Sequence, residues 1–113
     1  MTIAAELKPR LIYITTRSAE EAEKIARDVL ERHLAACANL IPGMRSFYRW
    51  EGKVAEGDEC VLILKTVSAR VDALISRVKA LHSYENPSIL ILPIEDGYAP
   101  FLSWIAESTA KIA

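Results

Sequence analysis

The sequence predicts one domain of the α/β (α+β) class, in which helices pack on a single antiparallel β-sheet. The chain has 113 residues, 51% of them hydrophobic, so it is long enough for one buried core and too short for two. Short β-branched runs alternate with two stretches whose apolar residues repeat at helical spacing. Two adjacent extended stretches have the length of a long hairpin. We therefore expect residues 1–113 to form a single domain, with an ordered core of about residues 10–110.

The first strand and the first helix are predicted before residue 31. Leu11–Thr15 is a β-branched and aromatic run, as is typical of a buried strand. Ser18 and Glu21 follow with the S-x-x-E spacing of a capping box, in which the hydroxyl and the carboxylate bond to free amides at a helix start. Apolar residues from Ala22 to Leu30 then recur at helical spacing. A helix that buries one face should therefore start at Ser18.

A long hairpin is predicted next. The extended stretch 37–50 contains Pro42-Gly43, which indicates an edge strand or a bulge. Glu51-Gly52-Lys53 offers a turn, and 59–66 returns as a strongly hydrophobic strand. These strands exceed the usual five or six residues, so the hairpin tip should extend beyond the domain. Exposed large rings are poorly tolerated in a monomer, so we expect the tip to dock on a neighbouring molecule. The rings are those of Phe47, Tyr48 and Trp50.

The second half of the chain repeats the strand and helix pattern. Ser68 is predicted to cap a helix whose apolar positions run from Val71 to Leu81. A strand at 88–94 and a final helix at about 98–109 follow. The order is βαββαβ with a C-terminal helix, which is the ferredoxin-like plan, and right-handed crossovers place both main helices on one face of the sheet.

The other face of this sheet should also be apolar. Val61–Leu64 and Ile89–Leu92 are hydrophobic at consecutive positions, and consecutive residues of a strand point to opposite faces. A sheet with two apolar faces needs a cover on each. In so short a chain, a second copy of the same chain is the simplest cover for the face without helices.

Composition argues against several partners. Fourteen basic and fifteen acidic residues nearly cancel, so no broad positive field would attract nucleic acid. The longest apolar runs are far shorter than the ~20 residues of a membrane span. The first eight residues lack the pattern of a secretory signal, so we expect a cytoplasmic protein with reduced cysteines.

Four residues have side chains that bind soft or borderline metals: Cys37, Cys60, His33 and His82. In the predicted hairpin the two cysteines are six residues out of register, about 20 Å apart. We therefore expect no disulfide and no shared metal, and we interpret both cysteines as small hydrophobic residues. His33 lies near the end of the first helix, where its imidazolium is expected to cap the last carbonyls.

Two segments resemble the CutA family of divalent-ion tolerance proteins. The first runs from Leu34-Ala35-Ala36-Cys37-Ala38-Asn39 through Trp50-Glu51-Gly52-Lys53 to Leu64-Lys65-Thr66. The second is Leu81-His82-Ser83-Tyr84-Glu85-Asn86-Pro87, followed by Leu92-Pro93-Ile94, Gly97-Tyr98 and Leu102-Ser103-Trp104-Ile105. The resemblance covers roughly residues 10–106. It implies a ferredoxin-like homotrimer with a cytoplasmic role in tolerance of divalent metals, copper above all, and an architecture similar to that of the PII signalling proteins.

His82 lies in the segment that is similar to the family's H-P-Y-E/Q-x-P signature. The resemblance implies a functional pocket there, although a structural cap is the alternative. His82 and Glu85 are the candidate ligands for weakly bound copper or zinc, which need three or four converging ligands. Ser83 replaces the usual proline. Copper-associated members carry Cys, His or Glu where this chain has, respectively, Thr15, Leu81 and Ser88, which argues against a high-affinity site of that kind.

A cleft between subunits is the second candidate site. Five residues could line it where one subunit's hairpin meets another subunit's turn, namely Trp50, Lys65, His82, Tyr84 and Tyr98. The alternative is that these rings only hold the trimer together. Such a cleft would suit a divalent cation or, as in a PII-like signalling module, a small anionic metabolite. We expect no enzyme, because an acylphosphatase-like hydrolase would have only Thr16-Arg17-Ser18 as an anion-binding loop.

Overall fold

The structure is a computed structural model that describes residues 4–110, so residues 1–3 and 111–113 of the predicted domain lie outside the described residues. It confirms the predicted βαββαβ order with a C-terminal helix. The strands and helices are β1 (Pro9–Thr16), α1 (Ala19–Glu31), β2 (Cys37–Trp50), β3 (Lys53–Val67), α2 (Val71–Leu81), β4 (Ile89–Pro93) and α3 (Ala99–Ser108). Two short 3-10 turns that were not predicted, η1 (Ala5–Leu7) and η2 (Ser68–Arg70), precede β1 and α2.

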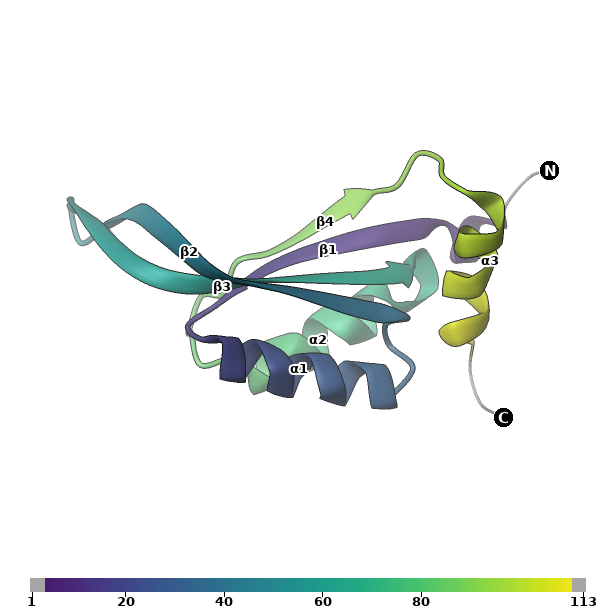
Figure 1. The fold of residues 1–113 in the computed structure, drawn as a ribbon, viewed down its shortest axis with the longest axis horizontal. Coiled ribbons are helices and arrows are strands. Elements are labelled where there is room, and N and C mark those ends of the chain that lie inside the picture. Colours follow the sequence, from purple (N-terminus) through teal and green to yellow (C-terminus); the bar gives the residue numbers. More distant parts are fainter. Residues whose placement is uncertain (1–3, 111–113) are drawn as a thin grey trace.

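The four strands form one antiparallel sheet in the order β2-β3-β1-β4. Helices α1 and α2 lie side by side on one face, and α3 lies at one end of the molecule (Figure 1). The prediction that both main helices share a face is therefore confirmed. Among the helices of residues 4–110, none combines the length and the apolar character that a membrane span requires.

The core lies between this sheet and α1 and α2. Alternate residues of β1 and β3 point toward the helices and are fully buried, because side chains alternate along a strand. They meet apolar residues of both helices that are also fully buried. The fully buried set includes Ile12, Ile14, Leu62, Leu64, Ile25, Val29, Leu74 and Val78.

An ion pair joins the two helices at the rim of the core. The Nε and Nη2 atoms of Arg77 donate to the two carboxylate oxygens of Asp28 at 2.8 and 2.7 Å. These hydrogen bonds are the main reason why the pKa of Asp28 lies below its ordinary value. The pair thus links α2 to α1.

The start of α1 follows the predicted capping box only in part. Ser18 Oγ accepts the amide of Glu21 at 3.1 Å, as expected. The Glu21 carboxylate does not return to the amide of Ser18, so that part of the prediction is wrong. It accepts the amides of Arg17 at 3.0 Å and of Ser83 at 2.8 Å instead. Glu21 therefore connects the helix start to the turn that follows α2.

The predicted roles of Ser68 and His33 as caps are wrong. The Ser68 hydroxyl donates to the carbonyl of Ala5 at 2.6 Å, and α2 starts without a side-chain cap. The end of α1 is closed by backbone amides, because His33 has a positive φ of 59° and the amide of Leu34 reaches the carbonyl of Val29 at 2.9 Å. The His33 ring instead has Nδ1 3.2 Å from the carbonyl of Ser108.

The hairpin of β2 and β3 has both the turn and the bulge that the sequence predicts. Its turn is the two-residue loop Glu51-Gly52, in which both residues have positive φ, between the paired residues Trp50 and Lys53. The register shifts at Pro42-Gly43, in the edge strand β2. We call the part of the hairpin beyond this bulge, Met44–Glu59, the arm.

The arm projects beyond the body of the sheet, so the predicted overhang is confirmed (Figure 1). The long axis of the molecule measures 49 Å, against 27 and 22 Å for the other two. The side chains of Phe47 and Trp50 on the arm are 61% and 62% exposed. These rings are in contact with solvent in the single chain.

The face of the sheet opposite α1 and α2 is apolar and largely open. On β4, Leu90 is 55% exposed and Leu92 44%. Their cross-strand partners on β1 are Tyr13 and Leu11, which alternate with the fully buried core residues and so lie on the face away from the helices. We call this surface the open face.

The cysteines lie apart, as predicted. Cys37 is opposite Lys65 in the β2–β3 ladder, whereas Cys60 lies beside the bulge, five positions away along β3. Both thiols are free, and Cys60 is buried.

Candidate functional site

His82 is the best-buried residue of the predicted sites. It directly follows α2 and is 8% exposed. Its Nδ1 accepts the amide of Tyr84 at 3.1 Å, so the ring proton is on Nε2, which lies 2.8 Å from the carbonyl of Thr15 and donates to it. His82 thus binds its own turn with one nitrogen and the end of β1 with the other.

Glu21 holds the same turn from the side of α1. Its burial would raise the pKa of the carboxyl, but hydrogen bonds from Ser83 and from the amide of Arg17, with the nearby His82, outweigh burial and lower that pKa. The charged carboxylate is therefore the form that the folded protein stabilises.

Replacement of Glu21 by Gln is expected to lower the free energy of unfolding by about 1–2 kcal/mol at pH 7, because one amide bond to a charged acceptor is lost. Since the pKa of Glu21 is lowered on folding, its contribution is present above the ordinary value of 4.5 and is lost as the pH falls below it. Urea unfolding at pH 7 and pH 3.5 should show the gap between wild type and Glu21→Gln closing at the lower pH. An equal gap at both pH values, or a similar loss in the exposed control Glu20→Gln, would contradict this role.

Tyr84 connects the turn to the hairpin. Its hydroxyl donates to Oε2 of Glu59 at 2.9 Å, and its ring centroid is 4.8 Å from that of His82. Burial, followed by the hydrogen bond to Glu59 and that residue's charge, raises the pKa of Tyr84 to about 12. Tyr84 therefore keeps its proton at neutral pH and stays a hydrogen-bond donor.

The Tyr84→Phe variant is expected to lose about 1–2 kcal/mol of unfolding free energy at neutral pH. The pKa of Tyr84 is higher in the folded state than the ordinary 10, so its contribution is complete below pH 10 and is lost as the pH rises toward 12. The free energy of unfolding should thus fall more steeply in wild type than in the variant between pH 10 and 12. Chemical unfolding over that range measures both slopes, and parallel slopes would count against the prediction.

The two predicted metal ligands do not form a metal site within one chain. The unprotonated nitrogen of His82 already accepts the amide of Tyr84, so a metal ion would have to displace that bond. The side chain of Glu85 is exposed. Within residues 4–110, no group of three or more His, Cys, Asp or Glu side chains is placed to hold a metal ion. The described part of one chain therefore does not place together the three or four ligands that copper or zinc needs.

The structure brings together only two of the five residues predicted to line a cleft. His82 and Tyr84 are neighbours, whereas Lys65 lies four positions from Val61, the β3 residue opposite Thr15, or about 13 Å along the strand. Trp50 lies at the tip of the arm, and Tyr98 lies just before α3. Within one chain these five residues do not share a cleft.

Lys65 lies in a second group that the sequence indicated only in part. Its Nζ donates to Oδ1 of Asn39 at 2.8 Å and lies 5.9 Å from the ring centroid of Phe101. Phe101 stacks on Trp104, with centroids 5.4 Å apart, and both rings are part-exposed. The i, i+3 spacing of Phe101 and Trp104 could have indicated this aromatic surface. We call Asn39, Lys65, Phe101 and Trp104 the lysine–aromatic group.

Polar groups of the loop Thr16-Arg17-Ser18 already form hydrogen bonds within the protein. Thr16 Oγ1 donates to the carbonyl of Ser18 at 2.8 Å, and the amide of Arg17 donates to the Glu21 carboxylate. A carboxylate in this position would repel an anionic substrate. These contacts argue against an acyl phosphate site in the loop.

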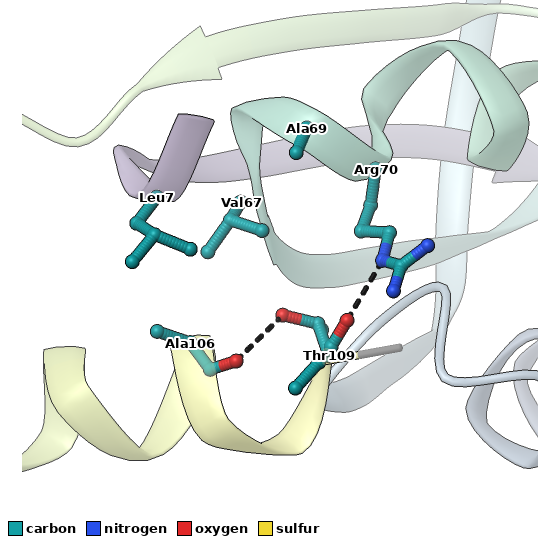
Figure 2. A pocket seen from close by; sticks show the side chains of 7 residues that line it. Leu7, Val67, Ala69, Arg70, Ala106 and Thr109 are labelled. Atoms are coloured by element: carbon teal, nitrogen blue, oxygen red, sulfur yellow. Dashed lines mark hydrogen bonds between the residues drawn. The ribbon is translucent and has the colours of Figure 1, made fainter. Parts of the chain in front are cut away.

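A small pocket lies elsewhere, between η1, η2 and the end of α3 (Figure 2). Its volume is about 260 Å³, and it is lined by Leu7, Val67, Ala69, Arg70, Ala106, Thr109 and Ala110. Arg70 Nε donates to the carbonyl of Thr109 at 2.7 Å, which joins η2 to the end of α3. None of the residues predicted to bind a ligand lines this pocket.

Comparison with known sequences identifies relatives of this chain. The model of the family described as CutA1 divalent ion tolerance protein matches residues 10–108. The Divalent-cation tolerance protein CutA of Thermus thermophilus is 44% identical over 99 residues, which are 88% of this chain and 96% of the relative. Protein CutA of Homo sapiens is 40% identical over 101 residues, which are 89% of this chain and 56% of the human protein.

Solved structures agree with this fold over nearly all of the chain. The crystal structure of CutA1 from Oryza sativa superposes with a TM-score of 0.91 at 37% identity, covering 96% of this chain and all of the other. That of Cut A1 from Thermus thermophilus superposes with a TM-score of 0.88 at 43% identity, covering 90% of this chain and 99% of the other.

Proposed function

The chain belongs to the CutA1 divalent ion tolerance family, and we propose that it supports tolerance of divalent cations as a homotrimer whose binding sites lie between the chains. The observation that carries this proposal is the combination of an open apolar face with an arm whose aromatic rings are exposed. A single chain leaves both in water. Three copies around one axis would bury them against one another.

The separation of the predicted site residues supports sites between chains. His82 and Tyr84 lie at the base of the arm, whereas Trp50 lies at its tip. The arm of a neighbouring copy can bring Trp50 close to the lysine–aromatic group or to the turn at His82. The five candidate residues, Trp50, Lys65, His82, Tyr84 and Tyr98, would then line one cleft made by two chains.

Copper or zinc is the ligand class that we propose for these clefts. His82 and Glu85 remain the candidate ligands of one chain, and a neighbour would have to complete the three or four that these metals need. Because His82 already accepts the amide of Tyr84, metal binding would compete with that bond. We therefore propose weak binding.

The proposed setting is the cytoplasm, and the proposed role is not catalytic. Free cysteines suit a reducing compartment. The names of two relatives give other compartments: one from Oryza sativa is named chloroplastic, and a structure from Archaeoglobus fulgidus is described as periplasmic. The absence of a role in catalysis is supported by the names of the relatives, which are tolerance proteins, and by the contacts that fill the loop Thr16-Arg17-Ser18.

The lysine–aromatic group favours a second candidate function. A lysine beside an aromatic plane can bind an anionic group and stack a flat ring. This combination would suit a PII-like signalling module that binds a small anionic metabolite, such as a nucleotide, between chains.

Calorimetric titration separates the two functions. Wild-type protein should give saturable heat with copper or zinc at micromolar or weaker affinity, and His82→Asn should lower that affinity at least about tenfold, whereas Lys65→Met should not. The PII-like function instead predicts heat with a nucleotide that Lys65→Met removes and His82→Asn leaves. Absence of heat with every metal and nucleotide would contradict both functions. The proposed trimer is tested separately, by measuring the mass of the protein in solution.

A further inference from the structure

The arm joins the body of the sheet at the Pro42-Gly43 bulge. Pairing of β2 with β3 is regular up to Ile41 and starts again at Met44. Proline has no amide to donate to the ladder. Gly43 has a φ of 79°, and outside Gly43 and its two chain neighbours no heavy atom lies within 4 Å of the place that a Cβ would take. The bulge thus interrupts the ladder on the β2 side, where a bulged strand bends, and we call this position the hinge.

A side-chain hydrogen bond crosses this hinge. Glu59 pairs with Met44 and so is the first residue of the arm on β3. Its carboxylate accepts the hydroxyl of Tyr84 at 2.9 Å, and Tyr84 belongs to the turn after α2. The bond therefore links the arm to an element outside the sheet. We call this hydrogen bond the latch.

The turn that carries Tyr84 is closed by one internal hydrogen bond and held to β1 and α1 by two others. The amide of Tyr84 donates to Nδ1 of His82, and Nε2 of His82 donates to the carbonyl of Thr15. The amide of Ser83 donates to Glu21, at the start of α1. Tyr84 thus has a fixed position relative to β1 and α1, and a bond from its hydroxyl can fix the direction of the arm.

We propose that the latch between Tyr84 and Glu59 sets the direction of the arm about the Pro42-Gly43 hinge, and so prepares the arm for docking on a neighbouring copy. An arm that is already aligned loses less conformational freedom when it docks. His82 and Glu21 are positioning residues in this scheme, since they act on the arm through Tyr84. The part that concerns docking rests on the proposed trimer, whereas the latch itself does not.

Hydrogen exchange measured by mass spectrometry on the full chain tests the latch. In Tyr84→Phe, peptides that span Leu40–Arg45 and Gly57–Val61 should exchange about fivefold faster, the factor that one hydrogen bond of ordinary net strength contributes to an equilibrium. Slowly exchanging peptides of α1 and β1 report the loss of global unfolding free energy, so the exchange at the bulge is compared with that in a variant of similar stability. The same measurement in a Trp50→Ala background removes the ring expected to dock on a neighbour, so that a docked arm does not hide the effect.

Matched variants separate the latch from general loss of stability. Glu59→Ala removes the acceptor and should produce the same increase, and the double variant should add nothing further, because both changes break one bond. Tyr98→Phe removes a hydroxyl from a side chain that is 77% exposed, and it should leave exchange at the bulge unchanged.

Unchanged exchange at the bulge in both Tyr84→Phe and Glu59→Ala would overturn the latch. An equal increase at the bulge in Asp28→Asn would overturn it too, because that variant weakens the ion pair of α1 and α2 and so destabilises the domain without touching the latch. The mass of the wild-type protein is a separate measurement. A wild-type chain that stays single would refute the trimer and the docking role, while the exchange result would still decide the latch.

Discussion

Replacement of Leu90 by Arg is expected to leave folded but unassembled single chains. Leu90 is 55% exposed on the edge strand β4, so a longer polar side chain fits there without disturbing the core. In the proposed trimer the same position is buried against a neighbour. An unpaired guanidinium buried at each interface should weaken assembly by at least about 3 kcal/mol, more than a hundredfold in the dissociation constant.

Sedimentation velocity or mass photometry gives the assembly state of Leu90→Arg, and circular dichroism shows whether its fold is kept. Lys24→Glu is the control, because Lys24 is exposed and belongs to α1, the helix that covers the face opposite the open face. A trimer that persists in Leu90→Arg would exclude the open face as the interface. A wild-type protein that is itself a stable single chain would refute the whole assembly.

Replacement of Trp50 by Ala is expected to weaken assembly by about 2–4 kcal/mol, the usual scale for a buried aromatic anchor at an interface. Trp50 lies beside the turn of the arm and is 62% exposed in the single chain. Its removal should therefore change the stability of the unassembled chain by little. The expected result is a shift of the concentration at which the trimer dissociates, with the secondary structure preserved.

The dilution series that measures this shift should include Val54→Thr as its control. Val54 is also on the arm and is 71% exposed, and threonine keeps its shape and its preference for a strand. An unchanged dissociation concentration in Trp50→Ala would show that the arm does not dock through this ring. A similar shift in both variants would indicate a general effect on the hairpin.

Elements with a strong local signal were predicted correctly from the sequence. Periodic apolar residues predicted α1 and α2, and Pro42-Gly43 predicted the bulge, because a missing amide and a positive φ act locally. The hairpin turn followed from Glu51-Gly52 for the same reason. Such signals depend on a few neighbouring residues, so they can be interpreted without knowledge of the rest of the chain.

Side-chain partners were predicted less well. Glu21 had the spacing of a capping box, yet its carboxylate binds the amide of Ser83, 62 residues away. Ser68 had the position of a helix cap, yet its hydroxyl binds the carbonyl of Ala5. In both cases a distant partner brought close by the fold replaced the local one, and local spacing contains no information on that competition.

At the candidate site, too, the local segment was predicted and its distant partners were not. The resemblance of the segment around His82 pointed to this turn, but its hydrogen bonds to Thr15, Glu21 and Glu59 come from three other elements. Only the fold shows that His82 has both nitrogens engaged, and that Lys65 lies beside Phe101 and away from His82.

The sequence by itself determined the strands, the helices, the bulge, the ferredoxin-like order and the apolar character of both sheet faces, because each follows from the spacing and type of nearby residues. Only the tertiary structure decided which polar groups meet, how far the arm extends and which apolar surface stays open. These depend on contacts between residues far apart in the chain, and such contacts form only when the sheet and helices pack together.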